Sequence, residues 1–122
     1  MHILSVKDIE KPLVQPHGET VYEMVGLLQE HGGAALHSLA LITLQPGKSS
    51  RPHLHRHSEE TYYILKGTPR MAVDGKEFHL SEGQACLIQP GETHQIFNDS
   101  NQVIEFLAVC APAWSPDDSY YV

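Results

Sequence analysis

The chain is poor in cationic residues and has no long hydrophobic run. Its 122 residues include 8 Lys and Arg against 15 Asp and Glu, a formal net charge of −7. Nucleic acids and anionic membrane surfaces attract basic patches, so we expect neither as a partner. No apolar run approaches the length of a membrane span, and residues 1–8 lack the cationic start and apolar core of a signal peptide. The expected location is therefore the cytoplasm.

Cysteine is scarce, with only Cys86 and Cys110 in the chain. Each lies in an apolar, strand-like run, where a free cysteine packs as a small hydrophobic residue. A disulfide would need an oxidising compartment, of which the sequence gives no other sign. Neither residue has a histidine and an acid nearby in sequence that would mark a nucleophile. We expect both thiols to be reduced and buried.

A helical signal is missing as well, because no segment of about ten residues or more repeats apolar residues with a 3.6-residue period. Short runs of Val, Ile, Leu, Tyr and Phe alternate instead with Gly, Pro, Asp and Asn, a pattern typical of a β-sandwich or small barrel. We expect a hairpin from 20–29 and 35–45, a strand ending at residue 55, and further strands at 60–66, 70–73, 76–80, 85–89, 94–98 and 103–110. The sequence predicts one all-β domain.

Two stretches carry residues that ligate transition metals. His53 and His55 are two positions apart and precede Glu60, and His94 follows the turn-like sequence of residues 90–93. Side chains two apart on a strand share a face, so the first two histidines can reach one ion from one wall. Glu60 joins that face only if the chain turns at residues 56–59. Three imidazoles and a carboxylate suit one divalent transition metal ion, and the ligand types do not choose among Mn, Fe, Ni, Co and Zn.

Each of these residues also has a plainer interpretation. His53 and His55 can be surface histidines on an edge strand, Glu60 can be half of an exposed Glu59–Glu60 pair, and His94 can cap a turn. Simple alternation would place His57 on the ligand face too, but its position in the expected turn makes it a bystander. The other histidines fit no ligand spacing. Among them, only His37 opens a strand that could line a barrel, and the solvent-exposed reading is favoured for it.

The two stretches resemble the conserved motifs of the cupin family. The first family motif, G-x5-HxH-x3–4-E-x6-G, is matched at every fixed position by residues 47–67. The motif requires six residues between its glutamate and its last glycine, Gly67, and this spacing selects Glu60 rather than Glu59. On an alternating strand, Glu59 would then point to the opposite face. The second motif, G-x5-PxG-x2-H-x3-N, is matched by residues 83–98. Its one departure is Gln89, where the family usually carries proline.

This resemblance implies a cupin double-stranded β-helix, or jelly-roll barrel, with little helix. It places an N-terminal extension at 1–18, the barrel at 19–110 and a C-terminal tail at 111–122. The tail carries Trp114, Tyr120 and Tyr121, so we expect it to pack on the surface of the barrel. Because cupins commonly pair through their terminal strands, the resemblance also implies a homodimer.

The expected cavity is apolar with a polar metal end, which suits a small-molecule ligand. If Glu60 faces the metal, Tyr62 faces inward with it, and Ile96 follows His94 on the same wall. On the last strand either Ile104, Phe106 and Ala108 or their alternating neighbours point inward, and the first set is favoured because the second would bury Glu105. We therefore take Tyr62, Ile96 and Phe106 as candidate substrate contacts, with plain core packing as the alternative for Tyr62 and Phe106.

The resemblance leaves the reaction open, because cupins with this ligand set include dioxygenases, oxalate-type decarboxylases and sugar-phosphate isomerases. The leading hypothesis is a metal-dependent dioxygenase or isomerase acting on a small carbonyl- or hydroxyl-bearing metabolite. Isomerase chemistry would also need a base, for which only Tyr62 and His37 are candidates. The rival is a non-catalytic module that binds or senses a sugar or metabolite. A metal-free barrel with catalytic histidines is a third reading, disfavoured because such a site does not need Glu60.

Overall fold

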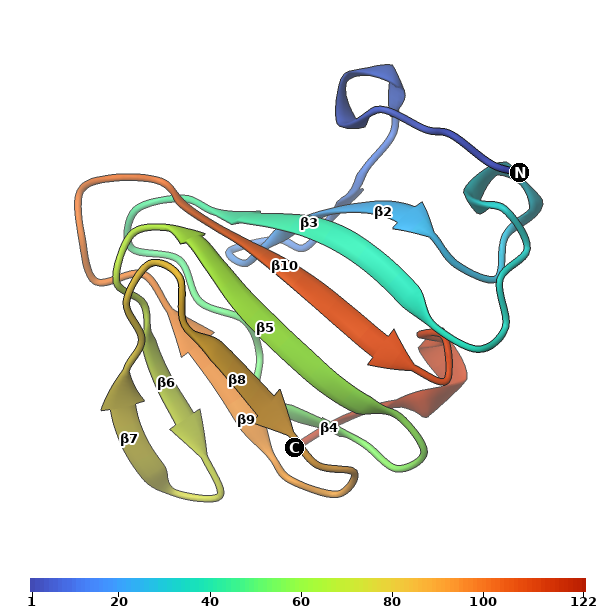
Figure 1. The fold of residues 1–122 in the computed structure, drawn as a ribbon. Helices are drawn as coiled ribbons and strands as arrows, with labels where there is room; N and C mark the ends of the chain where they lie inside the picture. Colours follow the sequence, from blue (N-terminus) through green and yellow to red (C-terminus); the bar gives the residue numbers. More distant parts are fainter.

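The computed structural model describes residues 1–122 and consists of two antiparallel sheets that face each other (Figure 1). The six-stranded sheet has the order β1 (Leu13–Val14), β2 (Thr20–Val25), β3 (Ser38–Leu44), β10 (Ile104–Ala111), β5 (Glu59–Lys66), β8 (Ala85–Ile88). The five-stranded sheet has the order β11 (Ser119–Tyr121), β4 (His53–His55), β9 (His94–Phe97), β6 (Arg70–Val73), β7 (Lys76–His79). The only helical segments are the 3-10 turns η1 (Val6–Asp8), η2 (Gln29–His31) and η3 (Pro116–Asp118). The all-β jelly-roll prediction is confirmed.

The strands expected from residue 20 to residue 110 are all present, most of them within a residue or two of their expected ends. The expected hairpin of β2 and β3 is antiparallel and shorter than predicted, because η2 and flanking turns occupy the connection. A turn at Asp74 and Gly75 joins β6 to β7. Two strands were not expected: β1, which pairs with β2, and β11, which pairs with β4.

The hydrophobic core lies between the two sheets. On β10 the favoured alternation is confirmed, since Ile104, Phe106 and Ala108 are buried whereas Glu105 is half-exposed. Burying apolar side chains from both inner faces supplies the main driving force for closing the sheets on each other. Gly67 ends β5 with a φ of +92°, and a Cβ there would lie 2.7 Å from Ile104 Cγ1. This close approach explains the need for glycine at that position.

The strand pairing fixes which side chains meet near β4. His53 is directly opposite His94 on β9 and opposite Tyr121 on β11. His55 is opposite Ser119 on β11. The facing wall comes from β5 of the other sheet, where Glu60 begins the inward-pointing series. No helix in the structure has the length and apolar character needed to cross a membrane.

Candidate metal centre

Four side chains from both sheets converge between the sheets: His53, His55, Glu60 and His94, called the His-Glu cluster below. One ligand atom from each lies within 4.8 Å of those from the other three. Glu60 Oε1 is 3.3 Å from His55 Nε2 and 3.2 Å from His94 Nε2. His53 is half-buried, whereas the other three members are buried. The chain turns at residues 56–58, and this turn is what allows Glu60 to join the face that carries the histidines, as expected.

Each histidine of the cluster is oriented by a backbone carbonyl. His53 Nδ1 donates to Arg51 O at 2.7 Å, His55 Nδ1 to Asp118 O at 3.1 Å, and His94 Nδ1 to Glu92 O at 3.0 Å. A carbonyl can only accept, so in each neutral ring the proton is on Nδ1 and the lone pair is on Nε2. This second-layer arrangement is typical of histidines that ligate a metal.

The donor set fits a divalent cation. His55 Nε2 is buried and makes no hydrogen bond, although Glu60 Oε1 is close. With the proton on Nδ1, the Nε2 lone pairs of His55 and His94 both face a carboxylate oxygen, an arrangement of acceptors that needs a cation or a shared proton among them. Three imidazole nitrogens and one carboxylate oxygen are ligands that Mn, Fe, Co, Ni and Zn accept.

The ionisation states of the cluster residues favour the binding of a cation. Burial, and then the charge of His94, lower the pKa of His53 to about 4, so this ring is neutral at pH 7. Burial alone would lower the pKa of His55, but the hydrogen bond and charge of Glu60, followed by Asp118, outweigh it. Burial alone would raise the pKa of Glu60, but His55 and His94 together outweigh it. The pKa of His55 is therefore raised and that of Glu60 is lowered. Without a metal, the cluster holds an ionised carboxylate that attracts a proton to His55.

The second oxygen of Glu60 is also engaged, because Cys110 Sγ donates a hydrogen bond to Glu60 Oε2 at 3.1 Å. Both cysteines are free, as expected, but only Cys110 is buried, whereas Cys86 is partly exposed. Burial, and then the charge of Glu60, raise the pKa of the Cys110 thiol, which therefore stays protonated and remains a donor. The thiol leaves Glu60 Oε1 as the oxygen that faces the histidines. No pattern in the sequence indicates this contact, because Cys110 and Glu60 are 50 residues apart.

The C-terminal tail holds the turn between His55 and Glu60. The carboxylate of Asp118 accepts hydrogen bonds from three successive backbone N–H groups, those of residues 56–58, at 3.0 to 3.2 Å. The backbone carbonyl of the same residue orients His55. Asp118 is thus a supporting residue that the sequence analysis missed, since no local pattern links it to a turn 60 residues earlier.

The turn before His94 depends on the residue that departs from the family motif. Gln89 N donates to Glu92 Oε1 at 2.7 Å. Proline has no N–H and could not make this bond. The carbonyl of Glu92 in turn accepts from His94 Nδ1. Gln89 therefore replaces the rigidity of a proline by a hydrogen bond that fixes the same turn.

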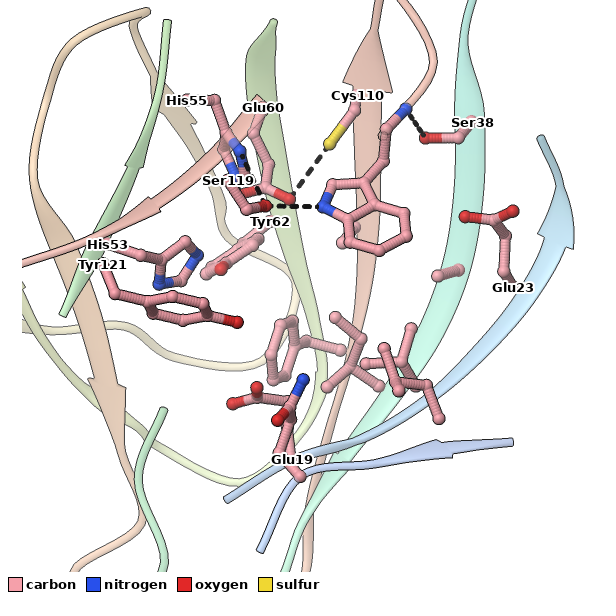
Figure 2. Close-up of a pocket in the computed structure, with 18 residues that line it drawn as sticks. Glu19, Glu23, Ser38, His53, His55, Glu60, Tyr62, Cys110, Ser119 and Tyr121 are labelled. Carbon is pink, nitrogen blue, oxygen red and sulfur yellow. Dashed lines mark hydrogen bonds and ion pairs between the residues drawn. The ribbon is translucent and has the colours of Figure 1, made fainter. Parts of the chain in front are cut away.

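A cavity of about 90 Å³ lies beside the cluster (Figure 2). His53, His55 and Glu60 form part of its wall. Of the candidate substrate contacts, Tyr62 and Phe106 line the cavity. Ile96, which belongs to the same hydrophobic core as these two, is not part of the cavity wall.

The two candidate bases of the sequence analysis do not suit that role. Tyr62 lines the cavity, but burial and the charges of Glu60 and Glu19 raise its pKa, so its hydroxyl remains protonated. His37 is exposed and lies outside the cavity. His57 is exposed and outside the cluster, as expected of a bystander. Outside the His-Glu cluster, the cavity wall also carries Glu19, whose Oε2 is buried without a hydrogen-bond partner and which no sequence pattern marked as a site residue.

The cavity opens into a vestibule of about 600 Å³ that both chain termini help to form. Leu13 from the N-terminal extension and Trp114 and Tyr121 from the C-terminal tail line both spaces. Trp114 Nε1 donates to Ser119 Oγ at 2.9 Å, which ties the tail to the strand beside β4. A ligand would therefore reach the cluster past the tails.

Comparisons with known proteins agree with this geometry. The family model described as a cupin domain matches residues 40–110. An oxalate-binding protein of Thermotoga maritima is 38% identical over 95 residues, which cover 75% of this chain and 77% of that protein.

Solved structures show the same fold. Polyketide cyclase RemF from Streptomyces resistomycificus gives a TM-score of 0.80 at 24% identity, covering 100% of this chain and 85% of that one. Bacillus subtilis oxalate decarboxylase, a protein with Mn(II) centres, gives a TM-score of 0.78 at 21% identity, covering 93% of this chain and 30% of that one.

Proposed function

This chain belongs to the cupin family, and we propose that it is a metal-dependent enzyme of dioxygenase or isomerase type that acts on a small carbonyl- or hydroxyl-bearing metabolite. In this proposal His53, His55, Glu60 and His94 bind one divalent transition metal ion. The ligand occupies the cavity next to the cluster.

One observation carries the proposal: three imidazole nitrogens and one carboxylate oxygen converge at one point, while every Nδ1 of the three histidines donates to a backbone carbonyl. A site built only for stability would gain nothing from lone pairs that face a buried carboxylate. A bound divalent ion would polarise a carbonyl or hydroxyl oxygen of the metabolite.

The residues that line the cavity would bind the metabolite and exclude water from it. Tyr62 stays protonated and offers a hydroxyl donor at the cavity wall. Ile42, Phe106 and Ala108 form an apolar wall beside the polar end. The small volume favours a ligand of only a few non-hydrogen atoms, and this supports short acids such as glyoxylate, glycolate or oxalate over a sugar phosphate.

The test is turnover by protein reconstituted with manganese, iron, cobalt, nickel or zinc. We expect at least one loaded form to convert a short keto, hydroxy or dicarboxylic acid, followed by oxygen uptake, carbon dioxide release and product analysis. A His55→Ala variant treated in the same way serves as the matched control and should be inactive. The proposal is wrong if no loaded form turns over any of these acids.

A second candidate is a non-catalytic binding protein, favoured by the 38% identity to a protein named for binding oxalate. It predicts that oxalate raises the melting temperature of the metal-loaded protein and is recovered unchanged. The same incubations therefore distinguish the two functions, because only the enzyme consumes its ligand.

A further inference from the structure

Glu19 places a second carboxyl group in the cavity wall. The residue lies immediately before β2, and its side chain lines the same space as His53, His55 and Glu60. Figure 2 shows its carboxyl across the cavity from Glu60. The carbonyl of Glu19 accepts a hydrogen bond from Gln15 N at 2.9 Å, which closes the loop that leads into β2. Its backbone is thus fixed, but its side chain is not part of the His-Glu cluster.

The carboxyl of Glu19 has an unused oxygen. Glu19 Oε2 is shielded from solvent and has no hydrogen-bond partner. Buried polar atoms are nearly always paired, because an unpaired one loses its hydration without compensation. Glu23, four residues further along the chain on the same wall, has a partner, since it accepts a hydrogen bond from His31 Nδ1 at 2.9 Å. The carboxyl of Glu19 therefore lines the cavity with hydrogen-bonding capacity that no group of the chain uses.

The surroundings of Glu19 favour its neutral form. Burial raises the pKa of Glu19; a hydrogen bond from its own N–H opposes this shift, and the charge of Glu60 adds to it. Glu19 forms no ion pair, and the guanidinium of Arg51 instead lies 3.9 Å over the ring of Tyr121. The titratable or charged groups on the walls around Glu19 are Glu60, Tyr62, His53, His55, Cys110, Glu23, Arg51 and Tyr121.

We propose that protonated Glu19 donates a hydrogen bond to the outer oxygen of a small carboxylate ligand bound between it and the His-Glu cluster. This inference rests on the proposed function, because the ligand must be held at the cluster. A carboxylic acid that faces an ionised carboxylate forms a charge-assisted O–H···O⁻ bond. An ionised Glu19 would repel the same ligand across a short, poorly solvated distance. Glu19 therefore selects ligands with an oxygen on the far side and makes their binding depend on pH.

The experiment measures the affinity of Mn(II)-loaded protein for oxalate and for glyoxylate by calorimetry between about pH 5.5 and about pH 8.5, where free short carboxylates are ionised. Metal content is checked by elemental analysis after each titration. Wild type is compared with Glu19→Gln, which keeps a donor that cannot ionise, and with Glu19→Ala, which has none. Glu23→Gln is the matched control on the adjoining strand β2, and melting temperatures verify that each variant is folded.

We expect the affinity of wild type and Glu23→Gln to fall by up to about tenfold per pH unit above the pKa of Glu19. The affinity of Glu19→Gln should stay level with pH, and Glu19→Ala should bind at least about fivefold more weakly than Glu19→Gln at every pH. If Glu19→Gln keeps the pH slope of wild type, or wild type shows no slope, this inference is wrong and the proposed function stands. If loaded wild type binds neither acid, the proposed ligand class fails and the inference fails with it.

Discussion

The tautomers of the three cluster histidines are set by single backbone carbonyl oxygens. Sequence spacing places His53, His55 and His94 together, but the tautomer that makes them ligands comes from three carbonyls, those of Arg51, Asp118 and Glu92. Fixing Nδ1–H leaves each Nε2 free for a metal without any cost for reorienting the ring. The ligand residues could therefore be predicted, whereas the atoms that orient them required the fold.

Proton competition at His55 makes metal affinity depend on pH. The carboxylate of Glu60 raises the pKa of His55, so below that pKa a metal must displace a proton from the ring. Apparent Mn(II) or Co(II) affinity should then rise by up to about tenfold per pH unit until the pKa is passed, and level off above it. His53, whose pKa is about 4, adds no slope above about pH 5. A profile that is flat from about pH 5.5 to about pH 8 would contradict this.

The thiol of Cys110 should support metal binding through Glu60. Cys110→Ala removes the donor to Glu60 Oε2, and we expect the metal to bind about tenfold more weakly, as is typical for loss of a supporting hydrogen bond. Cys110→Ser keeps a hydroxyl donor and should retain most of the affinity. Cys86→Ala is the matched control, because Cys86 is the other free cysteine and is outside the cluster. Equal metal affinities in all three variants would show that the Cys110 thiol does not support metal binding.

Two properties of the cavity could not be predicted from the sequence: the enclosure of Glu19 and the protonation state of Tyr62. Glu19 looks like an exposed acid before a strand, and only the closed barrel turns its side chain into an enclosed space. Tyr62 was predicted to point inward correctly, but its protonation state follows from burial and from the charge of Glu60. Sequence alternation gives the direction of a side chain, whereas its ionisation depends on distant neighbours.

At the scale of elements, the terminal segments complete the site. β11 lies beside β4, so the strand that carries two ligands is paired on both edges. A surface-packed tail was expected from the aromatic residues, but the short sequence 119–121 gave no strand signal of its own. Short strands form where the sheet offers an open edge, and that edge exists only after folding.

Asp118 of η3 should control both stability and metal binding. Asp118→Ala leaves three backbone N–H groups of the 56–58 turn without their acceptor, and we expect a loss of about 2–4 kcal/mol and weaker metal binding. Burial by itself raises the pKa of Asp118, but the three N–H groups outweigh it and the pKa is lowered. Its stabilising effect is therefore present above the ordinary pKa of a carboxylate and lost as the pH falls.

The matched control is Asp117→Ala, which changes an exposed carboxylate in the same short helix. Thermal and urea unfolding with metal titrations would measure both effects. Similar stability for the two variants would show that the Asp118 carboxylate does not hold the turn.

At the scale of the whole molecule, the cluster joins the two sheets. His53, His55 and His94 come from the five-stranded sheet, and Glu60 comes from the six-stranded sheet. An ion held by all four would link the layers at one point, and binding to the folded form alone raises stability. The motif spacing predicted the ligand set, but which sheet supplies each ligand is a property of the closed barrel.

The outer face of the six-stranded sheet carries exposed apolar residues on three adjacent strands: Tyr63, Leu65, Leu87 and Val109. Continuous patches of this kind are typical of interaction surfaces. The homodimer implied by the resemblance stays a prediction, and we expect a second copy to pack on this face. Light scattering should give the mass of two chains, and Leu87→Lys should give the mass of one. A wild-type mass of one chain would contradict it.

The most direct test of the account is the metal content of the purified, tag-free protein prepared without added metal. Elemental analysis of wild type is compared with a His53→Ala/His94→Ala double variant and with a His37→Ala/His57→Ala control, which changes only exposed histidines. We predict about one equivalent of a divalent transition metal in wild type and control, and its loss in the first variant. Negligible metal in all three proteins, even after reconstitution, would contradict the metal site and with it the proposed function.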